Sequence, residues 1–272
     1  MYYKWQGIHW VLSSLADIGY PPGDRQLFPL RDRALELWLR PSYFQEYLAR
    51  SQADTHRTGV PEMAGRYRRC ASQQGNALHY LVQLDLADGR ADALVERLLH
   101  WQWPDGGWNC DRRPEADTSS FMETLWPMLG LAAYGQHHGS PPALDASRRA
   151  AEVFLTRRLF KRAHGGQIIR SDFVKLHYPH YYHYDFLAGL RAMDRLGLVS
   201  DERCRDALDL LEEKELPEGG WPAEARYYRG TSRVMRSGAE WVDWGGTSRT
   251  QRNDWVTLDA LSVLVGAGRL SL

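Results

Sequence analysis

The sequence predicts an all-α protein built from repeated pairs of helices. Apolar residues recur at helical spacing in nine stretches, and Gly or Pro separates the members of each pair. A short loop that ends in Gly-Gly-Trp occurs twice, at 102–108 and at 217–221. Strand patterns are scarce, with only short extended pieces at 167–169 and 227–228. A loop reused between helix pairs is typical of a repeat architecture, either a solenoid or a closed ring.

Helical spacing defines the predicted elements in chain order. The first members of the pairs have small residues on mixed faces, as inner helices of a ring would, and the second members are more clearly amphipathic, as outer helices would be. The first predicted pair is 5–18 with 30–39. The second joins a helix that starts at 71 and ends at a break at 88–89 with the helix 91–101. The remaining pairs are 119–134 with 144–159 and 182–196 with 201–214, and the helix 253–267 has no partner.

Two connections, at about 40–70 and 222–252, are long enough to be functional or disordered loops. The first is polar and rich in arginine. The second contains Trp241, Asp243 and Trp244, so we expect it to be ordered in part.

Composition narrows the function classes. Lys plus Arg and Asp plus Glu both number 34, so charge gives no reason to expect a nucleic-acid partner. The three scattered cysteines fit a reducing compartment rather than a disulfide framework. No apolar run has the length of a membrane span and no signal sequence is recognised, so we expect a cytoplasmic protein. Aromatic residues make up 12% of the chain and either pack loops on helices or line a cavity.

The repeated loop is interpreted first as a structural clasp. Two glycines allow a tight reversal after an outer helix, and the tryptophan after them can lie back over the helix ends. Gln102 can hydrogen-bond backbone groups left unpaired at those ends.

The spacing of Gln102, Gly106, Gly107 and Trp108 resembles the QW repeat of squalene and hopene cyclases and, more distantly, the protein prenyltransferase β-subunits. The chain also looks like short single-domain squalene-cyclase-like proteins. The second loop has Glu215 where the glutamine belongs, and residues 164–167 are a degenerate third copy. The resemblance implies one α/α toroid domain over residues 1–272, with a central cavity that opens at the N-terminal ends of the inner helices. Such rings usually have six pairs, so a count of four to five pairs suggests an incomplete ring, and an incomplete ring would leave room for an oligomer.

The chain departs from the chemistry of these families. It lacks the Asp-x-Asp-Asp acid motif of hopene-type cyclases and the Asp-Asp-x-x-Asp motif that binds diphosphate through magnesium. Prenyltransferases bind zinc through Asp, Cys and His, and Glu123 falls about where the family's histidine would be. We therefore expect no metal and no cofactor.

Residues 176–190 hold the densest group of polar and aromatic side chains. His180 or His183 could act as a general acid or base whose pKa is set by Asp185. The alternative is that Asp185 caps a helix and the aromatic residues only pack. Tyr181 and Tyr184 are expected to contact a ligand.

Other candidates precede or begin inner helices. Asp111 could act as an acid or cap a helix, and Cys110 is interpreted as structural rather than nucleophilic. Glu123 is expected to form a capping box with Ser120, and it is also a candidate ligand contact. Trp241, Trp244 and Asp254 could form a wall that stabilises a cation, or close the last repeat. A metal site could draw on Cys110, Asp111 or the 180–185 segment, but no spacing is diagnostic.

These patterns predict a small terpenoid-cyclase-like protein that holds an apolar or isoprenoid-like molecule in an aromatic cavity. Catalysis, if present, would use acid–base chemistry by His180, His183, Asp185 and Asp111. The alternative is a non-catalytic binding or scaffold domain that keeps the ring. Because inner helices of a ring run parallel, we expect Asp111, the 180–185 segment and the Trp241–Asp254 region to converge on one pocket.

Overall fold

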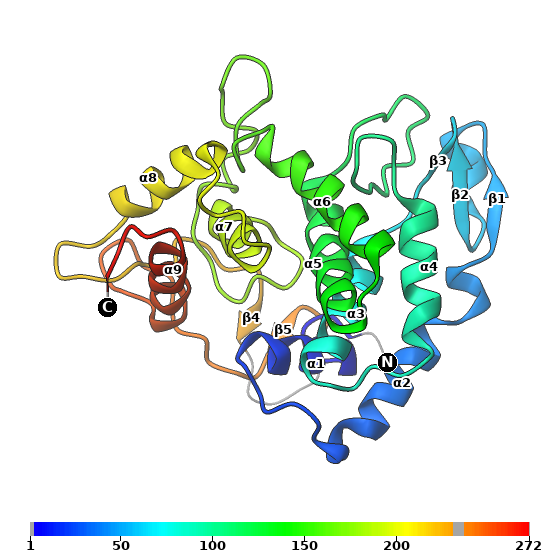
Figure 1. Cartoon of the computed structure of the whole chain (residues 1–272), viewed down its shortest axis with the longest axis horizontal. Coiled ribbons are helices and arrows are strands. Elements are labelled where there is room, and N and C mark those ends of the chain that lie inside the picture. The colour runs from blue at the N-terminus through cyan, green and yellow to red at the C-terminus, as the bar shows by residue number, and fades with distance from the viewer. Residues whose placement is uncertain (1–2, 231–236, 272) are drawn as a thin grey trace. The chain divides into compact units, whose positions relative to one another are not determined.

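The computed structural model describes residues 3–230 and 237–271. Over these residues the chain is mostly helical, as predicted (Figure 1). The α-helices are α1 (Ile8–Asp17), α2 (Phe28–Trp38), α3 (Ala71–Gln83), α4 (Ala91–Trp101), α5 (Phe121–His138), α6 (Pro141–Leu155), α7 (Phe186–Arg195), α8 (Arg205–Glu213) and α9 (Asp254–Gly266). Each overlaps a stretch whose apolar spacing predicts a helix, but α5 runs past the predicted end at residue 134, and α6 begins at Pro141 and ends at Leu155 instead of spanning 144–159. None of the helices within the described residues is long and apolar enough to cross a bilayer.

The chain packs into two compact units, which we describe separately. The first comprises residues 7–153 with residue 3, and the second comprises residues 4–6 with the described part of 154–271.

Helices α3 and α5 form the centre of the first unit and lie side by side (Figure 1). They run in the same direction, because Ser72 contacts Glu123 near the start of both helices and Gly75 lies against Pro127 one turn later. Most side chains of both helices are buried, whereas α4 buries only one face, which includes Leu94, Leu98 and Trp101. Within this unit, α3 and α5 therefore have the character of inner helices and α4 that of an outer helix.

The closest approach of α3 to α5 requires a glycine. A Cβ at position 75 would lie 2.2 Å from the backbone nitrogen of Pro127 and 2.6 Å from the carbonyl carbon of Trp126. On the facing side, a Cβ at Gly130 would lie 2.4 Å from the carbonyl oxygen of Gly75. The two backbones are thus in direct contact, and no side chain can be inserted between them.

Gly75→Ala should therefore destabilise the first unit, although alanine favours helix formation. Forcing a methyl group into a packed core costs about 1–3 kcal/mol or more, which outweighs a gain in helix propensity of about 1 kcal/mol. Gly89→Ala is the control, because a Cβ there meets no atom within 4 Å and the backbone needs no positive φ. Denaturant unfolding of both variants tests this; equal stability of the two would contradict the packing argument.

The 40–70 connection contains a small sheet that the sequence analysis did not predict. Strands β1 (Glu46–Leu48) and β2 (Val60–Met63) pair in parallel, and β3 (Arg66–Tyr67) pairs antiparallel with β2. The 222–252 connection likewise holds a parallel pair, β4 (Arg229–Gly230) and β5 (Ala239–Glu240). Strands of two to four residues carry too little side-chain alternation to be recognised from sequence.

Helices α7 and α9 pack together in the second unit. Their contacts advance together along both helices, from Arg191 with Asp259 to Asp194 with Gly266, so they too run in the same direction. A side-chain cap starts each helix: Asp185 accepts from the backbone of Ala188, and Asn253 accepts from Val256.

The two Gly-Gly-Trp loops share one set of hydrogen bonds. The backbone N–H of Trp103 donates to Gly107 and that of Gly106 donates to Trp103; Leu216, Gly220 and Gly219 repeat this pattern. The indole of Trp108 donates to the Leu98 carbonyl at 3.0 Å, and that of Trp221 donates to the Leu211 carbonyl at 2.7 Å. The backbone N–H groups of the two tryptophans donate to threonines of the following inner helix, Thr124 and Thr257.

Gln102 acts as the sequence predicts. Its amide group donates to the carbonyls of Gly106 and Ala146 at 2.6 and 2.8 Å, and so joins the loop to α6. The loops are thus structural clasps that tie α4 to α5 and α8 to α9.

Candidate functional site

Asp185 is the centre of a buried polar cluster in the second unit. Its side chain is fully buried, and it caps α7 through a 2.8 Å bond from the Ala188 N–H. It also accepts from the backbone N–H of His177 at 3.0 Å. The predicted capping role of Asp185 is therefore confirmed, and α7 begins after it rather than at residue 182.

Two histidines complete the environment of this carboxylate. His177 Nδ1 lies 2.7 Å from Oδ2 of Asp185, and His180 Nε2 lies 3.3 Å from Oδ1. Two backbone N–H groups and two imidazole nitrogens thus surround the carboxylate. Asp185 is therefore suited to orient the imidazoles.

The pKa of Asp185 reflects this arrangement. Burial by itself would raise the pKa, but the charges of His177 and His180 and their hydrogen bonds outweigh burial and hold it well below its ordinary value. Asp185 is therefore an anion at neutral pH.

Arg191 fixes the tautomer of His180. Its guanidinium lies 3.2 Å from His180 Nδ1 and 3.0 Å from the carboxylate of Asp259. A guanidinium only donates, so Nδ1 must accept and Nε2–H must point to Asp185. The imidazole of His180 is thus held between Arg191 and Asp185, with Nε2 3.3 Å from the carboxylate.

His177 has the geometry of a general base, although the sequence analysis chose His180 and His183 instead. Its Nδ1 lies 2.7 Å from the Asp185 carboxylate, which favours the tautomer with the proton on Nδ1 and a lone pair on Nε2. No residue in the described part of the chain hydrogen-bonds this buried Nε2 atom. A carboxylate that holds an imidazole in this tautomer is the orienting half of a catalytic dyad. The turn that brings residue 177 back to residue 185 is not readable from local patterns, so only the density of histidines could have indicated His177.

A layer of aromatic rings lies next to His177. The ring of His183 stacks on Tyr227 at 3.9 Å and on Tyr182 at 4.4 Å, and Tyr227 also meets the edge of His177 at 4.9 Å. Tyr182, His183 and Tyr227 are half-buried, so part of each of these side chains is accessible to solvent. We call these three residues the aromatic layer.

Lys4 lies at the edge of the aromatic layer. Its ammonium donates to the hydroxyl of Tyr182 at 2.7 Å and lies 4.7 Å from the centre of that ring. Burial, then the nearby charges of His177 and Lys4, lower the pKa of His183 to about 3. His183 is therefore a neutral imidazole at physiological pH and contributes an aromatic surface rather than a charge.

The other predicted ligand contacts occupy different environments. Tyr181 is buried, stacks on Trp5 at 4.2 Å and hydrogen-bonds Glu240. Tyr184 is buried and donates to the Leu159 carbonyl, as a core residue would. Trp244 is buried against the edge of Tyr178, at a centroid distance of 5.4 Å.

Trp241 and Asp254 lie outside this cluster. Trp241 is 55% exposed. The Asp254 side chain is 85% exposed and pairs only loosely with Arg252, at 3.4 Å. Among the residues predicted for this part of the chain, the structure thus brings together His180 and Asp185, with His183 beside them.

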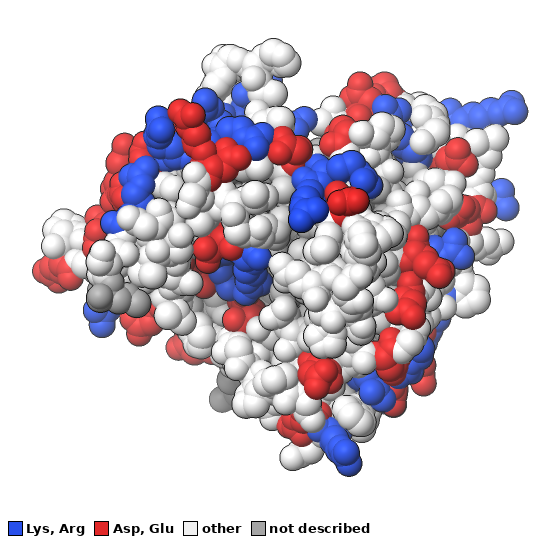
Figure 2. Space-filling model, viewed as in Figure 1, with Lys and Arg blue, Asp and Glu red and all other residues white. Residues whose placement is uncertain are grey.

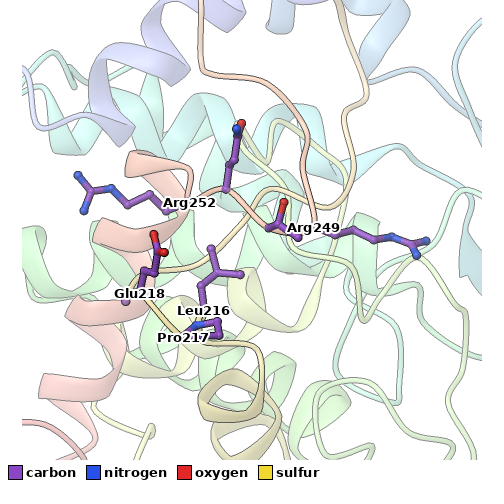
Figure 3. A pocket seen from close by; sticks show the side chains of 8 residues that line it. Leu216, Pro217, Glu218, Arg249 and Arg252 are labelled. Carbon is purple, nitrogen blue, oxygen red and sulfur yellow. The ribbon is translucent and has the colours of Figure 1, made fainter.

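A pocket of about 590 Å³ lies beside the second Gly-Gly-Trp loop. It is lined by Leu216, Pro217, Glu218, Gly219, Arg249, Thr250, Gln251 and Arg252. Figure 3 shows the guanidinium groups of Arg249 and Arg252 pointing away from each other, so they do not form a clamp for an anion. On the molecular face in Figure 2, positive and negative side chains are intermixed.

Asp111 and Glu123 belong to the first unit. Asp111 forms a two-point ion pair with Arg113, with contacts of 2.6 and 3.1 Å. The hydrogen bonds and charge of Arg113 lower the pKa of Asp111, so it is a stable anion rather than a proton donor.

Glu123 does not form the predicted capping box. Ser120 occupies the N-cap of α5, but its side chain makes no capping bond. The Glu123 carboxylate instead accepts from the Ser72 N–H at 3.0 Å and from the thiol of Cys110 at 3.3 Å. The capping-box interpretation is wrong because a tertiary partner at the start of α3 takes the carboxylate.

Cys70 joins Cys110 and Glu123 in a cluster whose ligand atoms all lie within 4.8 Å of one another. The interaction between the two cysteine side chains is the main cause that lowers the pKa of Cys70 and raises that of Cys110. The sequence analysis did not consider Cys70. Its position directly before a predicted inner helix was the available signal, since Glu123 lies in the first turn of another such helix.

Comparison with known proteins provides no assignment for either cluster. No known protein family has a sequence model that matches this chain, and no curated protein is significantly similar to it.

Proposed function

We propose that the second unit binds a small apolar or isoprenoid-like molecule against the aromatic layer of Tyr182, His183 and Tyr227. The observation that carries this proposal is the free Nε2 of His177 next to that layer, with Asp185 holding the imidazole from the other side. Stacked aromatic rings offer an apolar surface that can also stabilise a cation. The dyad adds a group that can accept or return a proton.

We also propose that the helix pairs follow the order of an α/α toroid like that of terpenoid cyclases. Two features support this proposal. Each unit contains a pair of parallel helices that pack together, α3 with α5 and α7 with α9. The clasp that joins an outer helix to the next inner helix recurs with the same hydrogen bonds.

In the proposed reaction each residue has one task. His177 accepts a proton from the ligand at Nε2. Asp185 keeps Nδ1 protonated and stabilises the imidazolium that results. His183 and Tyr227 hold the apolar body of the ligand. The proposal gives Asp111 no role, since Arg113 already occupies its carboxylate.

A non-catalytic binding or scaffold domain is the second candidate. The side chain of His177 is only 1% exposed, so a substrate reaches Nε2 only if the aromatic layer moves. A buried dyad of this kind could also serve stability alone.

Binding is tested first, with farnesol as the apolar probe and tryptophan fluorescence as the measurement. Tyr227→Ala should weaken binding by roughly 10-fold or more, because it removes one ring of the aromatic layer. Tyr47→Ala is the matched control, since Tyr47 is a half-buried tyrosine of the first unit. Equal affinity of both variants, or no binding by the wild type, would overturn the proposed site.

Catalysis is tested by analysing the products after incubation with farnesol and with squalene. His177→Gln should abolish conversion and leave binding largely intact, because glutamine keeps the polarity but cannot carry the proton. Binding without conversion by the wild type would favour the scaffold alternative.

A further inference from the structure

Two thiols and a carboxylate from three separate segments of the first unit meet near the starts of α3 and α5. Cys70 directly precedes α3, Cys110 follows the first Gly-Gly-Trp loop, and Glu123 lies in the first turn of α5. We propose that Cys70, Cys110 and Glu123 bind one Zn²⁺ ion. This inference is independent of the function proposed for the second unit.

The distances suit a tetrahedral zinc ion. With zinc–sulfur bonds of about 2.3 Å and zinc–oxygen bonds of about 2.0 Å, ligand atoms lie about 3.5–3.8 Å apart. The sulfur of Cys110 lies 3.3 Å from Oε1 of Glu123, and all three ligand atoms lie within 4.8 Å of one another. Movements of a few tenths of an ångström to about 1 Å, within the range of a side-chain adjustment, would complete the coordination.

The surroundings hold the carboxylate in place. Oε2 of Glu123 accepts the backbone N–H of Ser72 at 3.0 Å, which directs Oε1 toward the thiol of Cys110. The direct backbone contact of α3 with α5 at Gly75, one turn further on, keeps Cys70 and Glu123 at a fixed spacing. Such outer contacts orient metal ligands and are typical of built sites.

Charge also favours a divalent cation. Two thiolates and one carboxylate carry three negative charges in a partly buried place. Arg69 interacts electrostatically with all three side chains and offsets one of these charges. A Zn²⁺ ion would offset the other two.

The ligand set defines the kind of site. Two thiolates with one carboxylate favour zinc over the hard cations Mg²⁺ and Ca²⁺, which take oxygen ligands. Three protein ligands leave the fourth tetrahedral position open, and all three side chains are partly exposed. Zinc sites with an open position bind a water or substrate molecule, in contrast to closed structural sites. This set differs from the Asp, Cys and His set of prenyltransferases, because it has two cysteines and a glutamate. One of the cysteines, Cys70, lies at the start of α3.

Metal content gives the first test. The reduced full-length protein, stripped with a chelator and reloaded with ZnSO₄, should hold about one zinc per chain by elemental analysis. Cys70→Ser, Cys110→Ser and Glu123→Gln should each weaken zinc affinity by more than about 100-fold, because losing a direct ligand costs more than losing an outer contact.

Two controls separate ligands from neighbours. Cys204→Ser removes the third cysteine, which is buried in the second unit, and Asp111→Asn changes the carboxylate next to Cys110 that pairs with Arg113. Both should keep zinc at wild-type affinity. Zinc should raise the melting temperature of the wild type and of the controls but not of the ligand variants. The melting transition of the ligand variants without metal shows that they fold.

Substitution with Co²⁺ reports the ligands directly. Thiolate-to-cobalt charge-transfer absorption should appear in the wild type and fall by about half in each cysteine variant, since two thiolates contribute. The visible absorption bands of the bound Co²⁺ should shift when a small ligand such as azide is added, because the fourth coordination position is open. Absence of zinc and cobalt binding by the reduced protein would overturn the proposal, as would binding that survives the double cysteine variant. A Cys70–Cys110 disulfide in freshly isolated protein that takes up no metal after reduction would also overturn it.

Discussion

Replacing Trp108 with alanine should lower the free energy of unfolding by about 3–5 kcal/mol. Trp108 is 1% exposed, and its indole donates to the Leu98 carbonyl at the end of α4. The change leaves a large cavity and an unsatisfied carbonyl at the point where α4, the loop and α5 meet. Denaturant unfolding followed by circular dichroism measures the effect.

Trp241→Ala is the matched control for this experiment. It removes the same side chain from an exposed position, so stability should change by less than about 0.5 kcal/mol. If Trp108→Ala were as stable as Trp241→Ala, the clasp interpretation of the repeated loop would be wrong.

Asp185→Asn should cost about 3–5 kcal/mol, the usual effect of removing one partner from a buried charged cluster. Asparagine can still cap α7, but its amide cannot accept from His177 and His180 together. Asp254→Asn is the control, because Asp254 also lies at a helix start but is exposed and only loosely paired. Its effect should stay within about 0.5 kcal/mol.

The same substitution predicts a change in pH dependence. The pKa of Asp185 is lower in the folded state than the ordinary value near 3.9. Its contribution to stability is therefore complete above about pH 4 and is lost as the pH falls toward the folded-state pKa. Unfolding measured from pH 6 downward should show a steeper loss for the wild type than for Asp185→Asn. Parallel curves would mean that Asp185 is not an anion in the folded protein.

Helix positions were predictable because each helix carries its own apolar spacing and stop signals. The stretch 91–101 was predicted with the bounds that α4 has, since Gly89 ends the preceding stretch and Gln102 begins the loop. The start of α7 was placed four residues too early, because aromatic residues just before Asp185 extend the apolar pattern, although the helix begins only after the Asp185 cap. The small sheet at 46–67 was missed because its order depends on pairing between strands.

The candidate sites show the same limit. The density of histidines at 177–183 indicated the right segment, but the choice of residue depended on which imidazole nitrogen meets Asp185. Glu123 followed a local capping pattern that a residue of α3 overrides. Cys70 is 40 positions before Cys110, a distance across which no spacing rule applies. Tertiary contacts, which local sequence does not encode, decide all three cases.

The parallel course of α3 and α5 also gives the first unit an electrical polarity. Two helix dipoles side by side in the same sense repel each other and concentrate positive potential at one end. Cys70 and Glu123 place anion-forming groups at that end, and His137 and His138 place cation-forming groups in the last turn of α5. Acidic side chains thus lie at the end where the paired backbones concentrate positive potential, and histidines lie at the opposite end of α5. A charge reversal at either end would be unfavourable through the field alone, even at a position without a direct side-chain partner.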